Sequence, residues 1–159
     1  MMADYVELHT AQALATAAID LHELAEVIGD GYLPSRWGAA FEDLVATVLP
    51  DGRNLADDYL KRRGWKENVS TREYITGLRH SAISLYEVSG LVPGESMWRR
   101  DLVRSGEPIR VFEKSGSRGL RQWDRVATRV ITIRRRAAIS RTLMQLDNDT
   151  SEQVLASLR

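Results

Sequence analysis

The sequence predicts an α+β fold: an N-terminal helical half, then a small antiparallel β-barrel or meander, then a C-terminal helix. The first observation is a change of hydrophobic period. Apolar residues recur every three or four positions up to about residue 80, and they alternate with polar ones from Ala82 onward. The second is the spacing of Gly, Pro and Ser clusters, which divide residues 82–146 into segments about ten residues apart. Together these patterns predict about four helices followed by about five strands.

Four segments of the first 80 residues carry helix signals. The first ends at two glycines and has one apolar stripe, formed by Leu14, Ala17, Leu21, Leu24 and Ile28. A second helix is expected between Ser35 and Pro50. A third is expected between Asn54 and Gly64, with acidic residues in its first turn and basic residues in its last. The S-x-x-E spacing of Ser70 and Glu73 predicts a capping box at the start of the fourth.

The second half of the chain is expected to hold five short strands and a closing helix. The strands are predicted at residues 82–88, 96–103, 108–114, 125–133 and 138–146. Thr150 and Gln153 have capping-box spacing, so "SEQVLASL" is predicted to form the closing helix. The expected organisation is an acidic helical region over residues 1–80 and a basic barrel region over residues 81–159, which can share one core.

The composition is that of an ordinary globular protein, with 43% hydrophobic and 28% charged residues. No apolar run is long enough to span a bilayer, so no membrane partner is expected. The acidic N-terminus lacks the features of a secretory signal, which makes the cytoplasm the expected location. The absence of cysteine excludes thiolate metal sites, and the three histidines have no metal-ligand spacing. We therefore expect neither a metal nor a cofactor.

Charge is strongly segregated along the chain, although the total is zero. Residues 1–60 carry 2 basic and 11 acidic side chains, residues 61–141 carry 19 basic and 8 acidic ones, and residues 142–159 have a net charge of −2. Such asymmetry indicates either an anionic ligand for the basic part or docking of the acidic and basic parts on each other. Docking can occur within one molecule, with a protein partner, or between two copies of the chain.

Arginine dominates the basic part, and its planar guanidinium suits bidentate contact with phosphates as well as with carboxylates. The candidate anion- or nucleic-acid-binding residues are Arg99, Arg100, Arg118, Arg121, Arg134, Arg135 and Arg136. Trp98, Phe112 and Trp123 are available in the same half for stacking on bases. Trp65 stands among charged residues after a predicted helix end, so it is a further candidate contact residue.

Two short stretches of the strand half are expected to be turns. The triplet Arg134–Arg136 cannot point to one side of a continuing strand, so we expect it at a hairpin tip where all three side chains reach solvent. The stretch "SGSRG" at residues 115–119 is interpreted as a hairpin loop, and the alternative is a nest of backbone N–H groups that holds an anion.

Residues 81–130 resemble a segment of uncharacterised bacterial proteins, some of which carry a SEC-C zinc motif. The similarity rests on Tyr86-Glu87-Val88, Pro93-Gly94, Arg100-Asp101-Leu102, Glu113 with Ser115 and Ser117, Trp123-Asp124, and Arg129-Val130. The resemblance implies a fold unit and a bacterial origin, and it implies no activity. The SEC-C cysteines are absent here, so zinc binding does not carry over.

These observations favour a non-catalytic binding or interaction protein, with a protein partner or a second copy of the chain as the expected ligand. The first alternative is binding of single-stranded DNA or RNA on a basic face of the barrel. The second is an unrecognised hydrolase. It would need a cluster drawn from the available acid/base candidates, Asp57, Asp58, Lys61, Glu87, Glu113 and Asp124.

Overall fold

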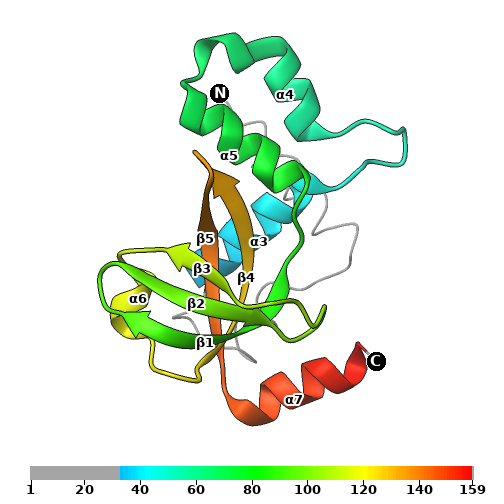
Figure 1. Cartoon of the computed structure of the whole chain (residues 1–159). Coiled ribbons are helices and arrows are strands. Elements are labelled where there is room, and N and C mark those ends of the chain that lie inside the picture. Colours follow the sequence, from blue (N-terminus) through cyan, green and yellow to red (C-terminus); the bar gives the residue numbers. More distant parts are fainter. Residues whose placement is uncertain (1–32, 159) are drawn as a thin grey trace.

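A closed five-stranded β-barrel is the centre of the fold (Figure 1). The structure is a computed structural model that describes residues 33–158. Around the barrel the strand order is β1-β2-β3-β5-β4. The strands are β1 (Ser84–Val92), β2 (Ser96–Asp101), β3 (Ile109–Phe112), β4 (Arg125–Ile133) and β5 (Arg136–Leu146).

The predicted fold class is wrong in its topology. An antiparallel meander would place β4 next to β3, whereas β3 pairs with β5 in parallel through Val111 and Ala137, and β4 pairs with β1. Helices are also not confined to the two ends of the chain, because the short helix α6 (Gly116–Gly119) lies between β3 and β4. The physical reason is closure: joining β3 to β5 removes the free edges that a flat meander would leave.

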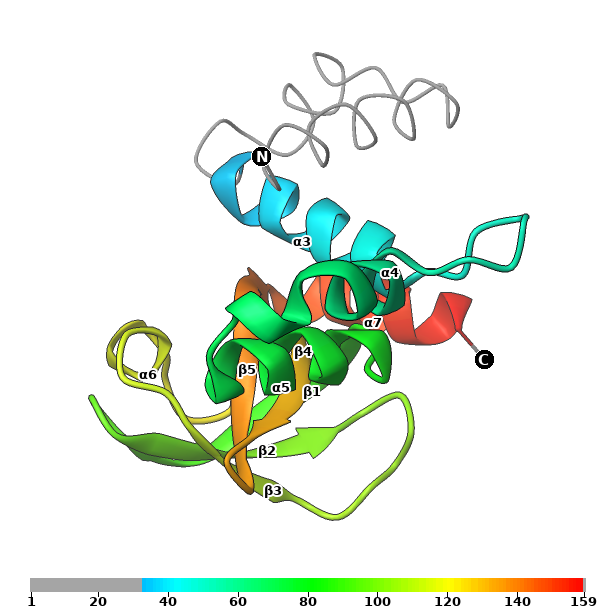
Figure 2. The same ribbon diagram turned by 90° about the horizontal axis from the view of Figure 1, so that it is seen from above.

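Helices α3, α4 and α5 lie together on one side of the barrel, away from β2 and β3 (Figures 1 and 2). The helices outside the barrel are α3 (Leu33–Ala46), α4 (Leu55–Arg63), the 3-10 helix η2 (Gly64–Lys66), α5 (Val69–Arg79) and the C-terminal α7 (Asn148–Ser157). The helix predicted around Leu14–Ile28 lies outside the described residues. Within residues 33–158, no helix combines the length and the apolar character needed to cross a membrane.

The predicted capping boxes do not form. Helix α5 begins two residues earlier than expected, because the Asn68 side chain accepts a hydrogen bond from the Thr71 backbone N–H. Helix α7 is capped in the same way by Asp147, which accepts from Thr150. Asn and Asp are as good N-cap residues as Ser or Thr, so the earlier polar residue takes the cap in both helices. Glu73 therefore takes no part in capping α5, and its carboxylate accepts a hydrogen bond from the Arg134 backbone N–H in the turn between β4 and β5.

Two hydrophobic clusters stabilise the fold. One fills the barrel and consists of Tyr86, Val88, Met97, Leu120 and Val126, with Leu91, Val130 and Leu143 packed against it. The other lies between the helices and the outer face of β4, and consists of Val45, Ala56, Ile75, Leu78 and Ile131, with five partly buried neighbours. The packing is tight at Gly77, where an added Cβ would come within 3.1 Å of the Ile131 side chain.

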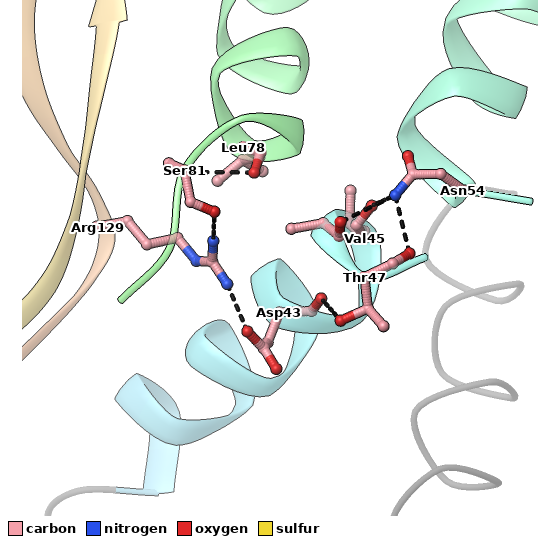
Figure 3. Close-up of polar contacts among 8 residues, drawn as sticks. Asp43, Val45, Thr47, Asn54, Leu78, Ser81 and Arg129 are labelled. Carbon is pink, nitrogen blue, oxygen red and sulfur yellow. Dashed lines mark hydrogen bonds and ion pairs between the residues drawn. The ribbon is translucent and has the colours of Figure 1, made fainter. Parts of the chain in front are cut away.

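A buried arginine anchors helix α3 to the barrel (Figure 3). Arg129 lies on β4 and donates to the Ser81 carbonyl oxygen and to Asp43 on α3, where its Nη2 is 2.5 Å from Oδ1. The burial cost of the guanidinium is therefore offset by two charge-assisted hydrogen bonds.

Candidate functional site

Aromatic and arginine side chains form a row on the outer face of β2, β3 and β5. Trp98 on β2 and Arg110 on β3 are cross-strand partners, so both point to the same face, and Phe112 follows two residues later on that face. Arg136 enters the row from the start of β5. We call Trp98, Arg110, Phe112 and Arg136 the aromatic–arginine strip. The described helices α3–α5 lie elsewhere, and Trp98 and Phe112 are 43% and 36% exposed.

Phe112 is the centre of the aromatic–arginine strip. The guanidinium carbons of Arg110 and Arg136 lie 5.2 and 5.1 Å from the centroid of its ring. Both distances are typical of cation–π contacts. Arg110 is further fixed by Glu95, at 3.0 Å, and by the Ser96 hydroxyl. The strip therefore presents the partly exposed ring of Phe112, with the oriented guanidinium groups of Arg110 and Arg136 over it.

The indole of Trp98 lies over a glycine on the neighbouring strand. A Cβ at Gly90 would be only 2.6 Å from Cδ1 of Trp98, and Gly90 has a φ of +50°. Both the close approach and the positive φ require glycine at this position. The absence of a side chain at Gly90 therefore makes room for the indole of Trp98, which remains 43% exposed.

The aromatic–arginine strip ends at the β4–β5 turn, whose two central residues are Arg134 and Arg135. Their φ angles are +49° and +62°, and Ile133 pairs with Arg136, as a type I′ turn requires. All three arginines of the triplet are exposed, and Glu73 on α5 accepts a hydrogen bond from the Arg134 backbone N–H at 2.8 Å. Type I′ turns favour Asn-Gly, so two arginines here place charge at the tip at a cost in backbone strain.

We expect the double substitution Arg134→Asn with Arg135→Gly to raise the free energy of unfolding by about 1–2 kcal/mol, because it relieves two left-handed arginines. Urea denaturation of the purified variant measures the change. The hydrogen bond to Glu73 uses the backbone N–H and survives the substitution. An unchanged or lower stability would contradict the strain assigned to this turn.

The loop at residues 115–119 binds the carboxylate of Glu113, so the anion held by its backbone N–H groups is part of the same chain. Oε1 of Glu113 accepts hydrogen bonds from the backbone N–H groups of Ser115 and Gly116, at 2.8 and 3.1 Å. Ser117 is fully buried and accepts from the Gly94 N–H. These contacts give the loop a structural role, because they join it to the turn between β1 and β2.

The other candidate residues lie apart from the aromatic–arginine strip. Arg99 is buried inside the barrel, and Arg100 pairs with Glu87 at 2.7 Å. Arg118 lies beside Gly94, and Arg121 is in the turn before β4. The structure thus brings Trp98 and Arg136 together and places Arg134 and Arg135 at the end of that row.

The two remaining candidate tryptophans are strongly exposed and lie at other places in the fold. Trp123 is 62% exposed in the turn before β4, with a φ of +73° that a bulky side chain rarely adopts. Trp65 is 74% exposed in η2, and Nζ of Lys66 lies 4.9 Å from the centroid of one of its rings. Neither therefore belongs to the row that starts at Trp98.

Arg110 is the site residue missing from the sequence-based candidates. The alternation in "PIRVFEK" gives it the same face as Phe112, but the sequence does not show that β3 runs beside Trp98 on one side and Arg136 on the other. Strand parity also carries a signal for Arg99: it shares a face with Met97, two residues earlier, which is fully buried.

Several β-half arginines pair with acids of their own half of the chain. Arg100, Arg104, Arg110 and Arg125 contact Glu87, Asp101, Glu95 and Glu152 respectively. Arg129 instead contacts Asp43 on α3. The six acidic residues of the first 32 positions lie outside the described residues.

The five carboxylates among the hydrolase candidates each make a contact within the chain, and that of Asp58 lies 3.8 Å from Nη1 of Arg53. Asp57 binds Arg79, Glu87 binds Arg100, and Glu113 binds the α6 backbone. Asp124 accepts from the Arg121 N–H and from Gln145.

Residues 39–159 match a protein family described as "Family of unknown function (DUF7986)". The chain belongs to this family. The region shared with DUF7986 contains the whole barrel, the aromatic–arginine strip, the β4–β5 turn and all helices after α3. Neither the curated proteins nor the solved structures yield a match to this chain.

Proposed function

We propose that the protein binds single-stranded nucleic acid on the aromatic–arginine strip, without catalysis. The observation that carries the proposal is the exposed Phe112 ring with Arg110 and Arg136 beside it, next to the exposed indole of Trp98. Single-strand-binding proteins combine aromatic rings, on which bases stack, with cations that follow the phosphate backbone. Trp98 and Phe112 supply two such rings on neighbouring strands.

Phosphate contacts come from the arginines at the edges of the strip. Arg136, Arg134 and Arg135 form a continuous basic end, and Arg110 retains free donor capacity beside its contact with Glu95. Surface ion pairs of this kind contribute little to stability, so a phosphate can replace the carboxylate at small cost. The whole chain has a net charge of zero, so attraction of a polyanion depends on residues 61–141, which carry 19 basic and 8 acidic side chains.

Docking between the acidic and basic halves is less well supported. Arg100, Arg104, Arg110 and Arg125 pair within the β half. The arginines at the turn are exposed and remain available to a ligand. We also propose a bacterial, cytoplasmic setting, supported by the resemblance of residues 81–130 to bacterial proteins and by the lack of cysteine.

Fluorescence anisotropy with labelled DNA and RNA strands of about 20 nucleotides tests the proposal, at about 50 and about 200 mM salt. We expect dissociation constants in the micromolar range that weaken with salt. Phe112→Ala should weaken binding about tenfold, because base stacking on one ring contributes about 1–3 kcal/mol. Trp65→Ala is the control, since it removes a ring that is more exposed than Phe112 (74% against 36%) and lies outside the strip.

The turn variant Arg134→Asn with Arg135→Gly separates binding from folding, because it should stabilise the fold while removing two charges. Its salt dependence should fall by about 1.4 in the slope of log K against log salt. Lys61→Gln with Arg62→Gln removes two exposed charges from α4 and serves as the charge control. Absence of binding at low salt, or equal losses in the strip and control variants, would refute the proposal.

A further inference from the structure

Arg99 is the most unusual side chain of the barrel interior. It lies on β2, and its cross-strand partners are Val88 on β1 and Ile109 on β3. The residue is fully buried, and Val88, Met97 and Val111 around it are also fully buried. A long charged side chain is thus placed in the apolar centre of a small barrel, where isolated charges are costly.

The guanidinium of Arg99 is poorly satisfied by the described residues. Its Nε contacts the Met97 sulfur at 3.4 Å, a weak acceptor. Its Nη1 and Nη2 have no hydrogen-bond partner among residues 33–158 and no appreciable solvent-accessible surface. Burial lowers the pKa of Arg99 to about 10, so the group remains charged at neutral pH.

Two acidic groups, Tyr86 and Glu113, interact electrostatically with the guanidinium of Arg99, but neither forms a hydrogen bond with Nη1 or Nη2. Glu113 attracts the guanidinium electrostatically, but its Oε1 is turned to the backbone N–H groups of Ser115 and Gly116. Burial raises the pKa of Tyr86, so the second group is a neutral phenol at neutral pH. The two terminal NH2 groups of Arg99 therefore face the barrel interior without an acceptor among the described residues.

We propose that Arg99 is an oxyanion-binding residue inside the barrel, which takes a small carboxylate or phosphate-type ligand on its two terminal nitrogens. A planar guanidinium binds two oxygens of such a ligand side by side, and the low polarity of the surroundings strengthens the contact. Natural proteins keep buried polar groups unsatisfied mainly where a ligand or a function compensates for them. This site is separate from the aromatic–arginine strip, which lies on the outer face of the barrel.

The barrel end next to α6 is the expected route of entry. Glu113 and Leu120 flank α6, and Leu120 belongs to the cluster that fills the barrel (Figure 1). The α6 segment is small and rich in glycine, and it is held by the Gly94–Ser117 hydrogen bond and by Glu113. The ligand must be small, because Nη1 and Nη2 have no appreciable solvent-accessible surface and the barrel has to open before they can be reached.

Thermal unfolding of the full chain with inorganic phosphate or with acetate, at ionic strength held constant with sodium chloride, tests the proposal. A ligand that binds only the folded state raises the Tm as its concentration increases. We expect wild type to gain about 3 °C or more with at least one of the two probes. The probe that acts identifies the phosphate or the carboxylate class.

Arg99→Met should abolish this gain and raise the Tm in the absence of the anion, because it removes a buried charge and keeps an unbranched side chain. Glu113→Gln keeps the acceptor for the α6 backbone but removes a nearby negative charge, so it should enlarge the gain. The turn variant Arg134→Asn with Arg135→Gly should keep the gain, which excludes phosphate bound at the β4–β5 turn as its source.

A direct measurement keeps the test decisive if Arg99→Met does not fold. The Nε–H resonance of Arg99 in wild type should shift on addition of phosphate or acetate and reach saturation. No shift, an equal Tm gain in Arg99→Met, or a gain that sodium chloride reproduces would overturn the proposal. Destabilisation by Glu113→Gln without any anion effect would instead assign Glu113 as the partner of Arg99, and would likewise overturn it.

Discussion

Asn54→Asp should lower the free energy of unfolding by about 3 kcal/mol, because it replaces a buried donor by an acceptor that faces several carbonyl oxygens. Asn54 is 4% exposed and joins two helices (Figure 3). Its Nδ2 lies 2.8–3.1 Å from the carbonyl oxygens of Val45, Ala46 and Thr47, at the end of α3. Two amide hydrogens serve three acceptors here, so at least one hydrogen bond is shared.

Substitution by aspartate removes the Nδ2 donors of Asn54 and leaves its second role, the capping of α4, in place. Its Oδ1 accepts from the Asp57 N–H and caps α4. Aspartate keeps that cap, since it is as good an N-cap residue as asparagine and has nearly the same shape. The loss expected for Asn54→Asp therefore belongs to the end of α3, where the carbonyl group of the buried Val45 loses its donor.

Urea denaturation monitored by tryptophan fluorescence measures the effect, and Asn68→Asp is the matched control. Asn68 is also an N-cap, but it is exposed and its Oδ1 makes the capping bond to Thr71. We expect the control to change the free energy of unfolding by no more than about 0.5 kcal/mol. Similar losses in the two variants would show that the α3 carbonyls do not depend on Asn54.

Much of the barrel could be predicted from hydrophobic alternation, because alternation reflects which residues of a strand are buried. The presence of a small β-barrel with mixed α and β content is confirmed. Its strand order could not be predicted, because β3 joins β5 through the single pair Val111 and Ala137, and no local pattern marks a contact between residues so far apart. The same holds for α6, whose four residues are too few for a helical period.

The candidate site could be predicted in its residue types and only partly in its positions. Sequence reasoning selected Trp98 and Arg136 by composition, and the register that places Arg110 between β2 and β5 depends on barrel closure. The charge pattern alone groups Arg99 with the surface arginines, because it takes no account of which face of the strand each residue occupies. Parity alone would have separated Arg99 from Trp98 and Arg100.

Asp43→Asn should cost about 2 kcal/mol of stability, because hydrogen bonds to charged groups contribute about 1.5–3 kcal/mol. The pair is asymmetric: the side chain of Arg129 is 1% exposed, whereas that of Asp43 is 64% exposed. Removing the negative charge leaves the buried guanidinium with the Ser81 carbonyl as its remaining partner among the described residues. The cost arises at Arg129, even though the substituted residue is on the surface.

A double-mutant cycle with Arg129→Met separates this pair from other effects of Asp43. In the Arg129→Met background, Asp43→Asn should cost no more than about 0.5 kcal/mol, because the buried charge that needs a partner is gone. Asp57→Asn, which breaks the more exposed pair with Arg79, is the control and should cost less than about 1 kcal/mol. The cost of Asp43→Asn should also persist at high salt, since a buried charge is weakly screened. Equal costs in both backgrounds would mean that α3 is held to the barrel by apolar packing alone and that Arg129 is not its anchor.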